Sequence, residues 1–131
     1  MSFKVSSTTI IPYGGSMHLV TSKKAALAIS DAFGGIPDFD GSTLGTTATC
    51  VGQDSGHFAL VFFVGKRSAK SAALVDTCAH EAAHGAAAIA EHFRLDVSDP
   101  GAEHYAYLLG YIAGWLWREV TNPQDEEEWD S

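Results

Sequence analysis

Residues 69–93 constrain the fold most, because they combine a high alanine content with the absence of proline. This composition predicts a long helix from about Ala69 to Phe93. The run Ser98-Asp99-Pro100 has a capping residue followed by proline and predicts the start of a further helix that ends near Val120. Alanine and glycine recur on both segments, so the two helices could approach each other closely.

Segments of strand-forming and helix-forming character precede these two helices. Residues 3–11 are rich in valine, threonine and isoleucine and predict a first strand. Residues 23–33 predict a helix, with Thr21 or Ser22 as its N-cap and Gly34-Gly35 as its end.

A hairpin signal follows. Residues 43–51 and 57–64 are both β-prone, and the polar, glycine-bounded segment 52–56 between them predicts a turn. The predicted order is therefore strand, helix, two strands, helix, helix. Because this order lacks βαβ repeats, we expect an α+β domain in which a hairpin or short mixed sheet precedes the two long helices.

Composition limits the possible partners. The chain has 131 residues and 46% hydrophobic residues, enough for one domain with a real core, which we expect to span residues 1–123. The formal net charge is −8, from 8 basic and 16 acidic residues, and the basic residues form no patch. Binding to nucleic acid or to an anionic membrane surface is therefore disfavoured. The acidic residues 124–131 predict a solvated, frayed tail.

The N-terminal residues, the apolar runs and the cysteines indicate where the protein is located and whether its thiols are reduced. Residues 1–9 lack the apolar stretch of a signal peptide, and no apolar run is long enough to span a membrane. Two cysteines are too few for a disulfide framework, so Cys50 and Cys78 are expected to be buried thiols, with a bridge between them as the alternative. Together these features predict a cytoplasmic protein.

His80-Glu81-Ala82-Ala83-His84 matches the pattern His-Glu-x-x-His within the long predicted helix. Residues i and i+4 project from one face of a helix, so both imidazoles could bind one zinc ion. Glu81 is rotated by about 100° from His80 and could take a proton from a zinc-bound water without ligating the metal. The alternative without a metal is an amphipathic helix with two surface histidines.

Glu103 is the expected third zinc ligand, since a catalytic zinc usually has three protein ligands and one open position. It falls on the first turn of the last predicted helix, where it could simply complement the helix dipole. His104 is its nearest competitor, and His92 and Asp99 are weaker ones. Tyr107 shares the face of Glu103 one turn later and is the candidate donor to an oxyanion, although core packing is the default for an aromatic residue there.

With these residues in place, the chain resembles a minimal zincin of the gluzincin arrangement, in which a hairpin, a motif helix and a glutamate-bearing helix follow one another. The run 99–111 also resembles small phage-encoded and prophage-encoded proteins of unassigned role. The resemblance implies a zinc metallopeptidase whose zinc-bound water is activated by Glu81. A peptide substrate is expected along residues 57–64 as an edge strand. The alternatives are a non-catalytic zinc-binding module that binds a host or phage protein, and hydrolysis of a non-peptide amide.

Overall fold

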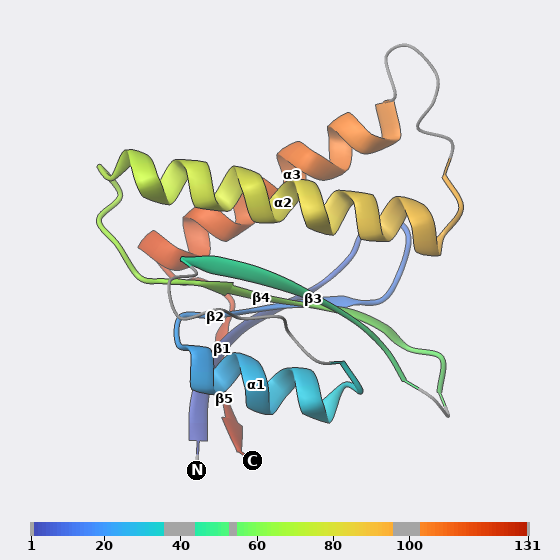
Figure 1. Ribbon diagram of the computed structural model, residues 1–131, viewed down its shortest axis with the longest axis horizontal. Helices are drawn as coiled ribbons and strands as arrows, with labels where there is room; N and C mark the ends of the chain where they lie inside the picture. Colours follow the sequence, from blue (N-terminus) through green and yellow to red (C-terminus); the bar gives the residue numbers. More distant parts are fainter. Residues whose placement is uncertain (1, 36–43, 53–54, 96–102, 131) are drawn as a thin grey trace.

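The computed structural model describes residues 2–35, 44–52, 55–95 and 103–130. Its elements form three layers, with two helices above a sheet and one helix below it (Figure 1). In chain order they are β1 (Ser2–Thr9), β2 (Ser16–Val20), α1 (Lys23–Ala32), β3 (Gly45–Val51), β4 (Phe58–Val64), α2 (Ala72–His92), α3 (Glu103–Thr121) and β5 (Glu126–Asp130). The expected α+β class is confirmed.

The sheet has the strand order β3-β4-β2-β1-β5. The β3–β4, β2–β1 and β1–β5 pairs are antiparallel, whereas β2 and β4 are parallel. The predicted hairpin is confirmed as β3 and β4. The strand β2 was not predicted, because five residues following a glycine pair are too few to show a clear alternation of apolar and polar positions.

The strand β4 lies inside the sheet, which corrects the expectation that residues 57–64 form an edge. It pairs with β3 on one side and with β2 on the other, and all its residues are buried. Its run Phe-Ala-Leu-Val-Phe-Phe-Val is continuously apolar, as is usual for a strand covered on both faces. The edge strand next to the motif helix is β3.

The acidic C-terminal segment is a strand, which corrects the expectation of a frayed tail at residues 124–131. The strand β5 pairs with β1 along the register Ser2↔Asp130 to Ser6↔Glu126, so the two ends of the described chain lie side by side (Figure 1). Lys4 Nζ lies 3.7 Å from a carboxylate oxygen of Glu126 across this pair.

The buried side chain of Glu119 anchors the turn into β5. Its carboxylate accepts hydrogen bonds from the backbone N–H groups of Gln124 and Asp125, at 2.8–3.1 Å, and from Arg118 Nε at 3.0 Å. These donors satisfy a charge that is 2% exposed. These charge-assisted hydrogen bonds fix the two residues that lead into β5.

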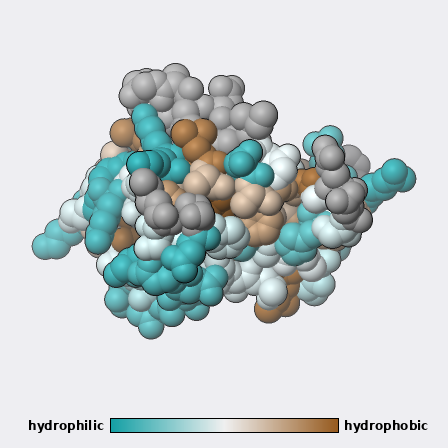
Figure 2. Space-filling view, turned by 90° about the horizontal axis from the view of Figure 1, so that it is seen from below, coloured by the Kyte–Doolittle hydropathy of each residue, from teal (hydrophilic) through white to brown (hydrophobic). Residues whose placement is uncertain are grey.

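Each face of the sheet carries its own hydrophobic core. The upper core packs β2 and β4 against α2 and α3, through residues such as Phe62, Ile89 and Ile112. Gly85 allows the close approach there, because a Cβ atom at this position would lie 2.7 Å from Phe62 Cζ. The lower core packs the other face against α1, around Ile29. Figure 2 views the molecule from this side, where hydrophilic residues surround a paler, more hydrophobic middle.

Several local predictions are confirmed. The side chain of Ser22 caps α1 by accepting a hydrogen bond from the N–H of Ala25. Cys50 and Cys78 are free, buried thiols, and burial raises the pKa of Cys78 to about 11. The proposed cap at residues 98–100 lies outside the described residues. Among the described helices, none is both long and apolar enough to cross a membrane.

Candidate metal centre

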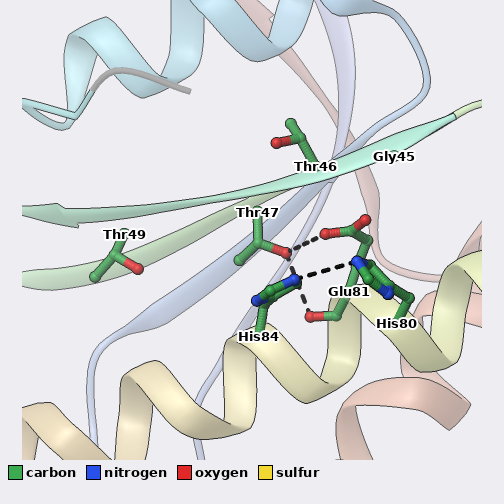
Figure 3. A pocket seen from close by; sticks show the side chains of 7 residues that line it. All are labelled: Gly45, Thr46, Thr47, Thr49, His80, Glu81 and His84. Carbon is green, nitrogen blue, oxygen red and sulfur yellow. Dashed lines mark hydrogen bonds between the residues drawn. The ribbon is translucent and has the colours of Figure 1, made fainter. Parts of the chain in front are cut away.

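The two histidines of the motif lie together on the exposed side of α2. His80 and His84 are one turn apart, and their Nε2 atoms are 3.2 Å apart, close enough for one nitrogen to donate a hydrogen bond to the other (Figure 3). The ring centroids are 4.8 Å apart with an interplanar angle of 75°. The helix therefore aims the same ring nitrogen of both imidazoles at one point.

This spacing fits two ligands of a single zinc ion. Zinc–nitrogen bonds of about 2.0–2.1 Å at a tetrahedral angle place two ligand nitrogens about 3.3–3.4 Å apart. The observed separation of 3.2 Å is within a few tenths of an ångström of that value. The histidine pair could therefore hold zinc with little rearrangement of either ring.

Glu81 lies between the motif helix and the edge strand. Its side chain is 5% exposed, and Thr47 Oγ1 on β3 donates to its carboxylate Oε1 at 2.9 Å. The same hydroxyl is 3.3 Å from the backbone oxygen of Glu81. Glu81 is thus held beside the imidazoles by a group from a different element (Figure 3).

The first residues of β3 are held close to α2. Arg67 donates from Nη2 to the carbonyl of Leu44 and from Nη1 to Thr77 Oγ1, at 2.9 and 3.1 Å, and so links the strand to the helix. Gly45 permits the contact, since a Cβ atom there would lie 2.6 Å from Thr77 Cγ2 and 3.2 Å from Glu81 Cγ. Two side chains outside the motif, those of Arg67 and Thr77, and the glycine at position 45 thus keep the start of β3 close to α2.

A cavity of about 490 Å³ opens between β3 and α2. It is lined by Gly45, Thr46, Thr47, Thr49, His80, Glu81 and His84 (Figure 3). The strand contributes only glycine and threonine, so its side of the cavity is small and polar. The imidazoles and the carboxylate are thus accessible from a space large enough for part of a peptide.

The structure places Glu103 and Tyr107 elsewhere. Both line a separate cavity of about 450 Å³ together with Ile11, Pro12, Tyr13 and His104. The reason is the orientation of α2, which turns Gly85 toward α3 and the core but turns the two histidines toward the edge strand. Within the described residues, no three side chains of histidine, cysteine, aspartate or glutamate are grouped to hold a metal. The expected third ligand is therefore not brought to the histidine pair.

The competing ligands are also apart from the pair. His104 Nδ1 is hydrogen-bonded to the hydroxyl of Tyr13 at 3.0 Å, and the ring of His92 stacks on Phe58 at a centroid distance of 4.3 Å. Asp99 lies outside the described residues. Tyr107 is half exposed, stacks on Tyr111 at a centroid distance of 6.0 Å and lines the separate cavity, so it is not among the residues that line the cavity at the motif.

Sequence reasoning missed Thr47. The hairpin prediction contained a usable signal, because the alternation of a strand puts residues 45, 47 and 49 on one face. The alternation does not predict which face of the strand meets the helix, or that the strand lies at the edge of the sheet. Those facts depend on how the sheet is ordered.

A second group of histidines lies around β2, away from the motif. His18 is buried, with Nδ1 2.8 Å from Ser7 Oγ and Nε2 2.8 Å from Ser16 Oγ, and Ser16 Oγ also contacts His57 Nε2 at 2.9 Å. Burial, and secondarily the charge of His57, lowers the pKa of His18 to about 4. His18 therefore stays neutral near pH 7, as a buried imidazole that contacts two serine hydroxyls.

Comparisons with protein-family models, with curated proteins and with solved structures gave no match.

Proposed function

We propose that this chain is a zinc-dependent metallopeptidase, with His80 and His84 as zinc ligands and Glu81 as general base. The observation that carries the proposal is the pair of Nε2 atoms 3.2 Å apart, beside a buried carboxylate and facing an open cavity. The two imidazoles would supply two of the three protein ligands that a catalytic zinc usually has, and they leave the side of the metal that faces the cavity open to a water.

The chemistry assigned to each group follows from its position. When bound, zinc would polarise the scissile carbonyl and lower the pKa of a water in its open coordination position. Glu81 Oε1 is engaged by Thr47, so Oε2 is the oxygen proposed to accept the proton of the attacking water. The same oxygen then passes the proton to the leaving amine as the peptide C–N bond breaks.

The substrate is proposed to bind along β3. An extended peptide can add to the edge of a sheet through backbone hydrogen bonds, and β3 is the edge strand beside the histidine pair. The small side chains of Gly45, Thr47 and Thr49 would leave space for the substrate. The proposal thus moves the expected peptide site from residues 57–64 to residues 45–51.

Glu103 and Tyr107 are left out of the proposed site, because both line the separate cavity beside Ile11 and Tyr13. We expect Glu103→Ala to change the zinc dissociation constant by no more than about twofold, whereas even loss of a group that only orients a ligand typically costs about ten-fold or more. A large loss of affinity in this variant would restore Glu103 as a ligand.

The direct test combines metal analysis with a peptide-degradation screen. Wild type should bind one zinc ion per chain, and the double variant His80→Ala/His84→Ala should bind none. His92→Ala is the matched control, since His92 is an exposed histidine on the same helix. Full zinc retention in the double variant would refute the metal site.

Glu81→Gln separates the peptidase from a non-catalytic zinc-binding module. Glutamine has nearly the shape of glutamate but cannot accept the proton, so this variant should keep zinc and lose hydrolysis. A wild-type protein that binds zinc but cleaves nothing in the screen would favour the binding module instead.

A further inference from the structure

We infer that Thr47 is a positioning residue, whose hydroxyl holds the Glu81 carboxylate in the orientation needed for proton transfer. The inference rests on the proposed function. It starts from a hydrogen bond that crosses from the edge strand to the motif helix, between Thr47 Oγ1 and Glu81 Oε1 at 2.9 Å (Figure 3).

The hydroxyl of Thr47 has one hydrogen to donate and two acceptors within reach. The carboxylate oxygen is at 2.9 Å and the backbone oxygen of Glu81 is at 3.3 Å. Hydrogen bonds to an ionised acceptor are the stronger ones, and the carboxylate oxygen is also the nearer, so the hydrogen goes to Oε1. In the described part of the chain, Thr47 supplies the one hydrogen bond that this carboxylate receives from another side chain.

A single hydrogen bond is enough to orient this carboxylate because the side chain is already confined. Glu81 is 5% exposed, and the strand backbone lies so close that a Cβ atom added at Gly45 would be 3.2 Å from Glu81 Cγ. Fixing Oε1 on Thr47 leaves Oε2 as the oxygen that can face the cavity and the imidazoles. Without the hydroxyl, rotation about the terminal bond would exchange the two oxygens and lower the population of the productive orientation.

The strand holds Thr47 at the right distance through the contacts described above. Arg67 donates hydrogen bonds to both Leu44 and Thr77. Gly45, two residues before Thr47, allows the strand to contact the helix. A substrate peptide on the outer edge of β3 would therefore contact the same strand that positions the base. This arrangement couples substrate binding and orientation of Glu81 through one strand.

The kinetic test compares Thr47→Val, Thr47→Ser and Thr8→Val. Valine keeps the β-branched shape but lacks the hydroxyl, so kcat should fall by about ten- to a hundred-fold while KM changes by no more than about twofold. Serine keeps the hydroxyl and should restore kcat to within about threefold of wild type. Thr8 is a strand threonine on β1, which β4 and β2 separate from β3, so Thr8→Val should retain the wild-type kcat.

A second measurement tests the hydrogen bond in the metal-free protein, independently of activity. In a double-mutant cycle on urea unfolding, Thr47→Val should lower the folding equilibrium constant by about ten-fold when residue 81 is glutamate. In the Glu81→Met background, which has no carboxylate, the same change should cost no more than about twofold.

The outcomes separate this inference from the proposed function. Equal losses in both backgrounds, or wild-type kcat in an active Thr47→Val enzyme, would overturn the positioning role while leaving the peptidase intact. A wild-type protein with zinc but without hydrolysis would overturn the proposed function and, with it, the positioning of a general base by Thr47, even if the cycle still reports the hydrogen bond.

Discussion

Replacing His18 with phenylalanine should remove a large part of the acid sensitivity of this fold. The imidazole is 6% exposed, stacks on Phe33 at a centroid distance of 4.6 Å and lies within hydrogen-bonding distance of the hydroxyls of Ser7 and Ser16. Burial, with a smaller contribution from the charge of His57, lowers the pKa of His18 from 6.5 to about 4. Phenylalanine keeps the stacked ring and cannot be protonated.

The sign and the size of the effect follow from proton linkage. In the unfolded chain His18 takes up a proton as the pH falls through 6.5, whereas in the folded chain it does so only near pH 4. Between these values the unfolded state binds more protons, so the free energy of unfolding falls as the pH falls. The pKa of His18 differs by 2.5 (6.5 − 4) between the two states, and at 1.36 kcal/mol per pH unit this corresponds to about 3 kcal/mol of unfolding free energy. This contribution is fully lost below pH 4.

The assay is urea unfolding of wild type and His18→Phe between pH 7.5 and pH 4. The variant loses the hydrogen bonds to two serines, so the informative quantity is the change in unfolding free energy with pH rather than its value at pH 7. We expect the wild-type curve to fall by about 3 kcal/mol more than the curve of the variant, most of it between pH 6.5 and pH 4.

His92→Phe is the matched control, because His92 also stacks on a phenylalanine ring but is exposed. This variant should follow the pH dependence of wild type. Parallel curves for wild type and His18→Phe would refute the reasoning, since they would mean that burial of His18 does not oppose its protonation.

Two further predictions test the packing around the site and the C-terminal strand. Gly85→Ala should destabilise the fold by about 1–3 kcal/mol in thermal or urea unfolding, because its Cβ atom would lie 2.7 Å from the buried ring of Phe62. Gly110→Ala, where no atom lies within 4 Å of the new Cβ, should instead stabilise the protein by about 0.5–1 kcal/mol, and a loss equal to that of Gly85→Ala would contradict the packing argument. Glu119→Ala should cost about 2–4 kcal/mol in urea unfolding, because it leaves two backbone N–H groups near β5 without their acceptor; an unchanged unfolding midpoint would show that the anchor is dispensable.

The sequence by itself determined the elements whose signals are local. The alanine-rich helix, an N-cap at Thr21 or Ser22 and the hairpin of β3 and β4 all follow from propensity, capping and turn residues, and the structure confirms them, with Ser22 as the cap. The proximity of His80 and His84 is local as well, because the α-helical repeat brings residues four apart onto one face whatever the rest of the chain does.

The tertiary structure decided every feature that depends on which elements are neighbours. The acidic run 126–130 has the composition of a solvated tail, yet pairing with β1 and the anchor at Glu119 make it a strand. The order of the sheet put β4 inside and β3 at the edge, so that Thr47 reached Glu81. The packing of Gly85 against Phe62 of β4 and Ile112 of α3 fixed the rotation of α2 that points the histidines away from Glu103. The spacing of residues along the sequence does not predict such contacts, because they depend on which faces of helices and strands far apart in the chain are buried against each other.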